Sequence, residues 1–307
     1  MSFNKPAAIG LAIVVVVAAA ISLNSHHNSN NAASGHKLQI VAAENFWGSL
    51  VSQLGGSRVA VTSVVSDPNA DPHEYESNTK NARSFATANY VILNGAGYDS
   101  WGNKLLSAQP NPQRKVLTVA TLVGKKEGDN PHLWYNPAYV NQAVSQMDKD
   151  LIVLDPGGKS YYQQQLKTLQ ASMAPYQSRI ASIKRQFGGT KVAATEDIFQ
   201  YLANAAGLDL VSPPAFIEAV AEGNDPPTAS VVAFQQQLQS DQVKALVYNQ
   251  QTVTPLTDSI KKLAANNNIP IVGVTETIQP PDTTFQDWMN AELINLENAL
   301  NANALGQ

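Results

Sequence analysis

Cysteine is absent from all 307 residues of the chain. Its absence excludes disulfides, thiolate metal sites, cysteine nucleophiles and lipid attachment through a cysteine, and it does not identify the redox compartment. Charge is scarce as well, because Asp, Glu, Lys and Arg make up only 14% of the residues, against roughly 25% in an average globular protein. The net charge is -4 and no basic cluster occurs. We therefore exclude nucleic acid as a partner.

The first residues have the composition of a targeting segment. Lys5 precedes a largely apolar run over residues 7–23, which indicates an export signal. The run is close to the ~20 residues that a spanning helix needs, so it is either cleaved or kept as a membrane anchor. Residues 24–35 are polar and rich in Asn and Ser, which is typical of a disordered tether. We expect residues 1–36 to be a signal or anchor segment followed by a linker.

Strand-like and helix-like segments alternate along the rest of the chain. The strand-like runs are 38–43, 59–65, 90–93, 115–119, 191–195, 208–211, 244–248 and 269–274, and the helical patterns between them are 45–54, 79–88, 101–106, 198–206, 230–239 and 256–266. Such alternation predicts an α/β fold with parallel sheets, whose ligands bind at the carboxyl ends of the strands.

Residues 159–187 are the longest stretch with helical spacing. A continuous helix of that length would span about 44 Å, with a kink at Pro175 because an interior proline removes a helical hydrogen bond. The alternative is two shorter helices packed as a hairpin. We predict an N-terminal α/β lobe over 37–158, a connecting helix over 159–187 and a C-terminal α/β lobe over 188–307, since a chain of this length suggests two domains.

Four residues are candidate metal ligands. His73 lies in the segment Asp71-Pro72-His73-Glu74-Tyr75-Glu76, His132 lies in a second Pro-His pair, and Glu196 and Glu276 each follow an apolar strand-like run. Imidazole and carboxylate cover the preferences of zinc, manganese and iron. The wide separation of the four excludes a zinc finger or a helical His pair, so only the fold can gather them.

Each candidate also has a structural interpretation. The segment around His73 is compatible with a solvated acidic loop. His132 is compatible with a histidine at the start of a helix that packs on Trp134, and Glu196 with a residue that stabilises the following helix through its dipole.

Several segments, in this order, resemble the solute-binding proteins of zinc and manganese ABC importers. They are the motif around His73, Asn-Pro-His-Leu-Trp-Tyr-Asn-Pro at 130–137, the long helix, Ala-Ala-Thr-Glu-Asp-Ile-Phe-Gln-Tyr-Leu at 193–202 and Val-Thr-Glu-Thr-Ile at 274–278. The resemblance covers about residues 38–300. It implies two Rossmann-like lobes joined by one rigid helix, with a metal ion in the cleft between them.

The resemblance also implies the ligand set. His73 and His132 match the two histidines of the family's N-terminal lobe. Glu196 stands where zinc-type members often have histidine and manganese-type members have glutamate. Glu276 stands where the family usually has aspartate, so it is one methylene longer. The long His/Asp-rich loop of some zinc-type members is missing before His132.

We therefore expect an extracytoplasmic, monomeric receptor that captures one divalent transition metal ion and passes it to an ABC-type membrane permease. Two imidazoles and two carboxylates, with Glu276 able to chelate, would offer up to six donors, which favours Mn2+ over Zn2+ as cargo. We do not expect an enzyme. The alternatives are a metal-dependent hydrolase with Glu74 or Asp197 as general base, and a surface adhesin with a metal-stabilised fold.

Overall fold

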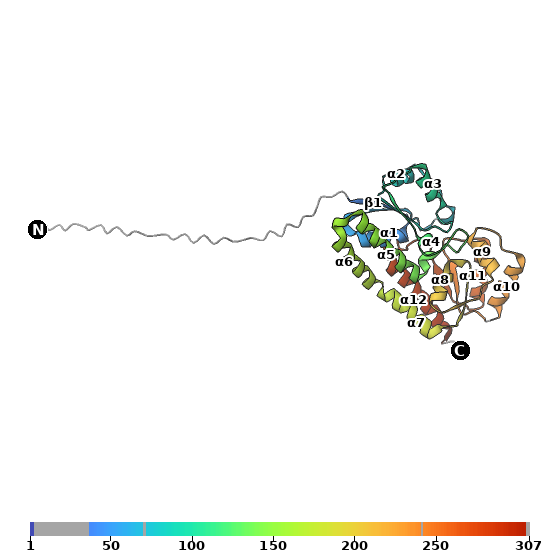
Figure 1. The fold of residues 1–307 in the computed structure, drawn as a ribbon. Helices are drawn as coiled ribbons and strands as arrows, with labels where there is room; N and C mark the ends of the chain where they lie inside the picture. The colour runs from blue at the N-terminus through green and yellow to red at the C-terminus, as the bar shows by residue number, and fades with distance from the viewer. Residues whose placement is uncertain (3–36, 70–71, 241, 305–307) are drawn as a thin grey trace. The chain divides into compact units, whose positions relative to one another are not determined.

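Two four-stranded sheets, each parallel throughout, form the framework of the computed structural model (Figure 1). The first sheet has the order β2-β1-β3-β4 and the second β6-β5-β7-β8. The strands are β1 Leu38–Glu44, β2 Val59–Val65, β3 Tyr90–Leu93, β4 Lys115–Thr118, β5 Lys191–Ala194, β6 Asp209–Leu210, β7 Leu246–Asn249 and β8 Ile271–Val274. The α/β class with two lobes predicted from the sequence is confirmed. We call the parts built on the first and second sheets the N-lobe and the C-lobe.

The structure describes residues 1–2, 37–69, 72–240 and 242–304. Of the expected signal or anchor segment and its linker, only residues 1–2 are among those described. Asp71 also lies outside the described residues. Among the described residues, no helix combines the length and apolar character that crossing a membrane requires.

Helices cover the sheets, and two of them begin with a capping residue followed by a proline. The larger helices are α1 Asn45–Gly55, α2 Thr79–Thr87, α3 Ser100–Ala108, α5 Pro137–Leu154, α6 Lys159–Ser172, α7 Ala174–Phe187, α8 Gln200–Ala205, α9 Pro214–Ala221, α10 Thr228–Gln239, α11 Pro255–Asn266 and α12 Phe285–Ala304; a single turn forms α4 Val119–Leu122. Asn136 caps α5 ahead of a proline at its first position, and Thr254 does the same for α11. Both prolines sit where the missing N–H costs nothing.

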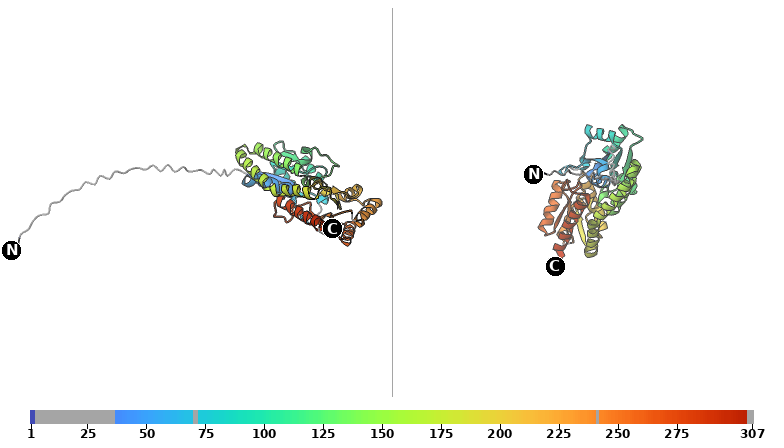
Figure 2. Two further views of the ribbon diagram at one scale, coloured as in Figure 1. Left: turned by 90° about the horizontal axis from the view of Figure 1, so that it is seen from below. Right: turned by 90° about the vertical axis from the view of Figure 1, so that its left-hand side faces the viewer.

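Helices α6 and α7 run on end to end as one rod, seen clearly in Figures 1 and 2. The break is a single residue, Met173, whose backbone stays helical, and it lies just before Pro175. Helix α6 packs on α1 and α5 in the N-lobe, whereas α7 packs on α12 in the C-lobe. The expected long helix with a proline-associated irregularity is therefore observed, and the hairpin alternative is wrong.

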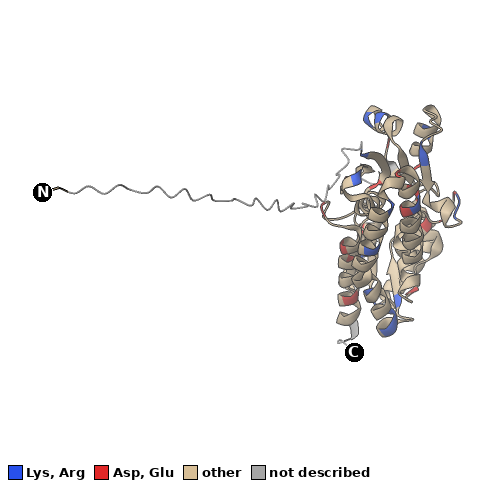
Figure 3. Ribbon diagram, turned by 60° about the vertical axis from the view of Figure 1, so that its left-hand side comes forward, with Lys and Arg blue, Asp and Glu red and all other residues tan. Residues whose placement is uncertain are grey.

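One apolar core extends through both lobes. It includes Trp47 and Trp134 from the N-lobe, Tyr176 from α7 and Leu293 from α12, all fully buried. Charged residues are sparse and scattered along the described part of the chain (Figure 3). The lobes are thus joined by packing as well as by the connecting helix, and the carboxyl ends of their strands meet where the candidate residues lie.

Candidate metal centre

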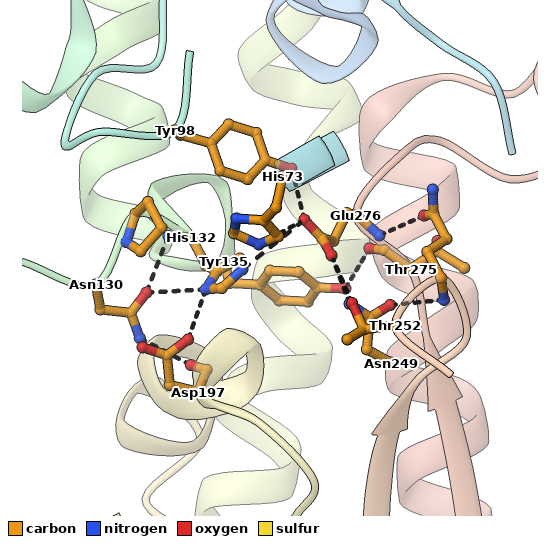
Figure 4. A network of polar contacts seen from close by, with 12 residues as sticks. His73, Tyr98, Asn130, His132, Tyr135, Asp197, Asn249, Thr252, Thr275 and Glu276 are labelled. Atoms are coloured by element: carbon orange, nitrogen blue, oxygen red, sulfur yellow. Dashed lines mark hydrogen bonds and ion pairs between the residues drawn. The ribbon is translucent and has the colours of Figure 1, made fainter. Parts of the chain in front are cut away.

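Three of the four predicted residues lie together between the lobes (Figure 4). His73 lies in a short 3-10 turn after β2, His132 precedes a similar turn at Leu133–Tyr135, and Glu276 follows β8. One donor atom from each lies within 4.8 Å of the other two. His132 and Glu276 are fully buried and His73 is partly exposed. The fold therefore gathers residues that are far apart in the sequence.

One oxygen of Glu276 faces both imidazoles. Its Oε2 lies 3.2 Å from His73 Nε2 and 3.9 Å from His132 Nε2. Burial alone would raise the pKa of Glu276, but the hydrogen bond and charge of His73 and the charge of His132 outweigh burial. The pKa falls to about 2. Glu276 is therefore a carboxylate at any physiological pH, with one oxygen directed at the histidines.

Glu196 follows β5 and is also fully buried, but its oxygens lie outside this tight group of three. It precedes a short 3-10 turn at Asp197–Phe199 and makes no capping hydrogen bond there. Neither oxygen makes a hydrogen bond of ordinary length with the described residues, although the Asn249 amide is near enough to favour the charged form. Burial, followed by the charge of Glu276, raises the pKa of Glu196 well above its usual value.

A buried carboxylate with so few partners costs free energy, and a second carboxylate nearby adds repulsion. A cation placed between Glu196 and Glu276 would relieve both costs. The residues present therefore fit a divalent ion.

The ring of His132 is oriented by its other nitrogen. Its Nδ1 lies 3.0 Å from Asn130 Oδ1 and 2.9 Å from Asp197 Oδ1. The two oxygens beside Nδ1 favour a proton there, and the hydrogen bond is made to Asn130 Oδ1, because the Asn130 amide nitrogen is already committed to the backbone oxygen of Asp197 at 2.8 Å. Nε2, which has no hydrogen bond to a described residue, keeps its lone pair for a metal. His132 also packs edge-on against Trp134, so that part of the structural interpretation holds too.

Three residues that the sequence analysis did not single out hold the Glu276 carboxylate. The Tyr98 hydroxyl donates a 2.6 Å hydrogen bond to Oε2, the Asn249 amide donates one of 2.5 Å to Oε1, and the Thr252 hydroxyl lies 3.4 Å from Oε1. Tyr98 and Asn249 lie near the ends of β3 and β7. The rule that ligands bind at carboxyl ends of parallel strands was the one signal that pointed to them.

A cavity of 460 Å³ lies beside the group and is lined by residues of both lobes. His73 and Tyr98 are among its lining residues, and its acidic lining residues are Asp129, Asp197, Glu218 and Glu222. Its lining among the described residues includes neither Lys nor Arg. Such a wall attracts cations and repels anions.

A buried set of imidazoles and carboxylates, placed where two parallel α/β sheets present their carboxyl ends, defines a solute-binding protein of the metal-ion type. The chain belongs to the ZnuA family, because the family model, described as the periplasmic component A of a zinc-uptake complex, matches residues 40–299. The resemblance stated from the sequence motifs is thereby confirmed.

Known relatives agree with this membership. The chain is 23% identical over 285 residues to the manganese ABC transporter substrate-binding lipoprotein PsaA of Streptococcus mitis, covering 87% of this chain and 89% of that protein. It is 24% identical over 200 residues to the iron ABC transporter substrate-binding lipoprotein MtsA of Streptococcus pyogenes serotype M1, covering 60% and 63%.

Among solved structures, the solute-binding protein FpvC of Pseudomonas aeruginosa in complex with Mn2+ superimposes with a TM-score of 0.71. It is 17% identical and the match covers 87% of this chain and 99% of FpvC. That likeness shows the shared fold.

Proposed function

We propose that the chain captures one divalent transition metal ion between its lobes, through His73, His132, Glu196 and Glu276, and delivers it to the permease of an ABC importer. The observation that carries the proposal is the convergence of His73, His132 and Glu276 within 4.8 Å. The buried Glu196 carboxylate beside them supplies the fourth side chain. Four protein side chains would supply most of the ion's coordination sphere, as suits a capture site.

The geometry revises the number of donor atoms. Glu276 directs one oxygen at the histidines and its other oxygen is bonded by Asn249, so it offers one donor rather than two. Glu196 makes no ordinary hydrogen bond with described residues and is able to offer both oxygens. Two imidazole nitrogens and three oxygens make five donors. With one water this completes six-fold coordination, which suits manganese better than zinc, so we propose Mn2+ as the cargo and Zn2+ as its closest competitor.

A hydrolase is the less favoured function. Asp197, one of the two candidates for a general base, has a carboxylate oxygen 2.9 Å from His132 Nδ1, which suits a residue that orients a ligand electrostatically rather than one that acts on a substrate. The membership of the chain in a family of transport components agrees with a role without catalysis. Incubating the metal-loaded protein with ester, phosphate and peptide substrates tests this directly, and turnover would contradict it.

The protein acts outside the cytoplasm as an importer's receptor, in keeping with its family. Relatives such as PsaA are named as lipoproteins, whereas the present sequence has no cysteine to carry a lipid. We propose that the apolar segment at 7–23 takes over as the tether if it is not removed, and that the receptor is a monomer whose partner is the permease.

Elemental analysis combined with titration of the metal-free protein tests the capture function. We expect one ion per chain, with a large loss of affinity in His73→Ala and His132→Ala and none in the matched control His26→Ala. Equal losses in all three, or no bound metal in the intact protein, would reject the site. The cargo is tested separately by metal accumulation in cells with and without the gene. Cells without the gene that lose zinc uptake but keep manganese uptake would reject manganese as the cargo.

A further inference from the structure

The loop that follows β3 has an unusual backbone. Gly95, Ala96 and Gly97 have φ values of 81°, 55° and 91°, three successive residues in the left-handed region. The conformation of Ala96 costs conformational free energy, because left-handed backbone is unfavourable for a residue with a Cβ atom. Gly95 is needed for a second reason, since a Cβ atom there would lie 2.6 Å from a methyl group of Thr118. A strained loop of this kind persists only where its surroundings hold it.

Asp99 holds this loop. Its carboxylate accepts hydrogen bonds from the backbone N–H of Asn94 at 2.6 Å and of Gly95 at 2.8 Å. The Asn94 side chain in turn donates to the backbone oxygen of Pro131 at 2.8 Å, which fixes the loop to the segment carrying His132. The turn therefore has one position relative to the N-lobe histidines.

The residue that the turn places is Tyr98. Its ring lies edge-on against His73 at 4.9 Å and is tilted against Trp134 at 5.3 Å, and it is 7% exposed. Its hydroxyl crosses to the C-lobe and donates to Glu276 Oε2, the oxygen that faces both histidines (Figure 4). Packing alone would be served equally well by a phenylalanine, so the hydroxyl is the informative part of the side chain.

Asn249 and Thr252 bind the other oxygen of the same carboxylate from the C-lobe. The Glu276 backbone is fixed as well, since Gln251 Oε1 accepts its N–H at 2.7 Å. With Tyr98 on one oxygen and Asn249 on the other, the carboxylate cannot turn to direct both oxygens at an ion without breaking one of these bonds. The longer side chain of Glu276 is thereby confined.

We infer that Tyr98 is a specificity-determining positioning residue, which restricts Glu276 to binding through one oxygen and so keeps Zn2+ competitive at a site whose donor set favours Mn2+. The inference rests on the proposed capture function and concerns the same site. Without the hydroxyl, only the contacts of Asn249 and Thr252 with the other oxygen resist that turn, so chelation by Glu276 costs less. Chelation suits the larger Mn2+, whereas Zn2+ prefers four ligands and gains little from it.

The test compares Tyr98→Phe with Tyr90→Phe by measuring Mn2+ and Zn2+ affinities in competition with a chromophoric chelator. Tyr90 is a matched control, because it also loses a buried 2.8 Å hydrogen bond to a carboxylate, that of Asp150, at the amino end of the strand. Loss of a hydrogen bond to a metal-binding carboxylate typically costs about 10- to 100-fold in affinity. We expect a zinc loss of that size in Tyr98→Phe and a smaller loss for manganese, so that the zinc-to-manganese affinity ratio falls roughly threefold or more.

A fall in the ratio confined to Tyr98→Phe supports the inference. An unchanged ratio overturns it even if both affinities decrease, and so does an equal fall in Tyr90→Phe. These outcomes are distinct from failure of the capture function, which would appear as no metal binding by the unmodified protein. Thermal unfolding of both variants establishes that each is folded.

Discussion

The Nδ1 atom of His132 lies 2.9 Å from the Oδ1 atom of Asp197, although the two residues belong to opposite lobes. Asn130 adds to this junction, because its amide donates to the Asp197 backbone oxygen and its Oδ1 lies beside the same Nδ1. The hydroxyl of Tyr201 also donates to the Asn130 backbone oxygen at 3.0 Å. The contact that orients a proposed ligand is therefore also one of the contacts that hold the lobes together.

The first prediction concerns Asp197. Replacing it with Asn removes the charge that favours a proton on His132 Nδ1, and the affinity for Mn2+ and Zn2+ should fall about 10- to 100-fold, as is typical when the partner of a ligating histidine is lost. Titration calorimetry measures the change. Asp209→Asn, an exposed aspartate on β6, is the control and should bind normally. An unaltered affinity in Asp197→Asn would show that Asn130 alone orients the ring.

The second prediction concerns protons released by metal binding. Burial and the Glu276 charge raise the pKa of Glu196, so below that raised pKa an ion must displace a proton from the site. Affinity should therefore increase as pH rises towards the raised pKa. Glu196→Gln should bind more weakly and release about one proton fewer per ion, measured by calorimetry in buffers of different ionisation enthalpy. Glu218→Gln, an exposed residue lining the same cavity, should release as many protons as the intact protein. Identical proton release in Glu196→Gln would refute the assignment.

Much of this site was predictable because parallel strands end at one edge of their sheet. The apolar runs before Glu196 and Glu276 are strands β5 and β8, and the run before His73 is β2. The resemblance to the family predicted that two lobes face each other across a metal site, which strand prediction alone does not give. The assignment of all four residues as ligands stays a prediction, with three of them gathered by the fold.

The polar network around Glu276 was not predictable in the same way. Tyr98 and Asn249 contact one carboxylate from two different sheets, so their roles depend on how the lobes pack and not on local spacing. Helices α5, α9 and α12 were also absent from the predicted elements. The omission of α12 was avoidable, since its buried residues recur at helical spacing; they are Phe285, Gln286, Trp288, Met289, Glu292, Leu293, Leu296, Ala299 and Leu300.

The third prediction concerns Glu292, which is buried in α12. Burial raises its pKa to about 8, although hydrogen bonds from Tyr135 and Thr275 oppose the shift. The folded protein then keeps a proton that the unfolded chain loses above its ordinary pKa of 4.5. The unfolded state binds fewer protons over this interval, so the free energy of unfolding should decrease as pH rises from about 4.5 to about 8.

Glu292→Gln imitates the protonated side chain and should make this decrease smaller by on the order of a few kcal/mol. Urea unfolding of the metal-free protein at the two ends of the interval measures it. The exposed Glu222→Gln should retain the full decrease. Parallel pH profiles for Glu292→Gln and the intact protein would show that Glu292 is charged in the folded state.

The last prediction is that the lobes move little when metal binds. Helices α6 and α7 form one rod anchored on the N-lobe at one end and on α12 at the other, which resists a hinge. Hydrogen bonds also cross between the lobes, at Tyr98 to Glu276 and at Tyr135 to the backbone oxygen of Thr275. Small-angle scattering should therefore give nearly equal radii of gyration with and without metal. Inserting two glycines between Met173 and Ala174 would loosen the rod, and that variant should compact on metal addition more than the intact protein does. Equal compaction of both proteins would show that the rod does not limit the motion.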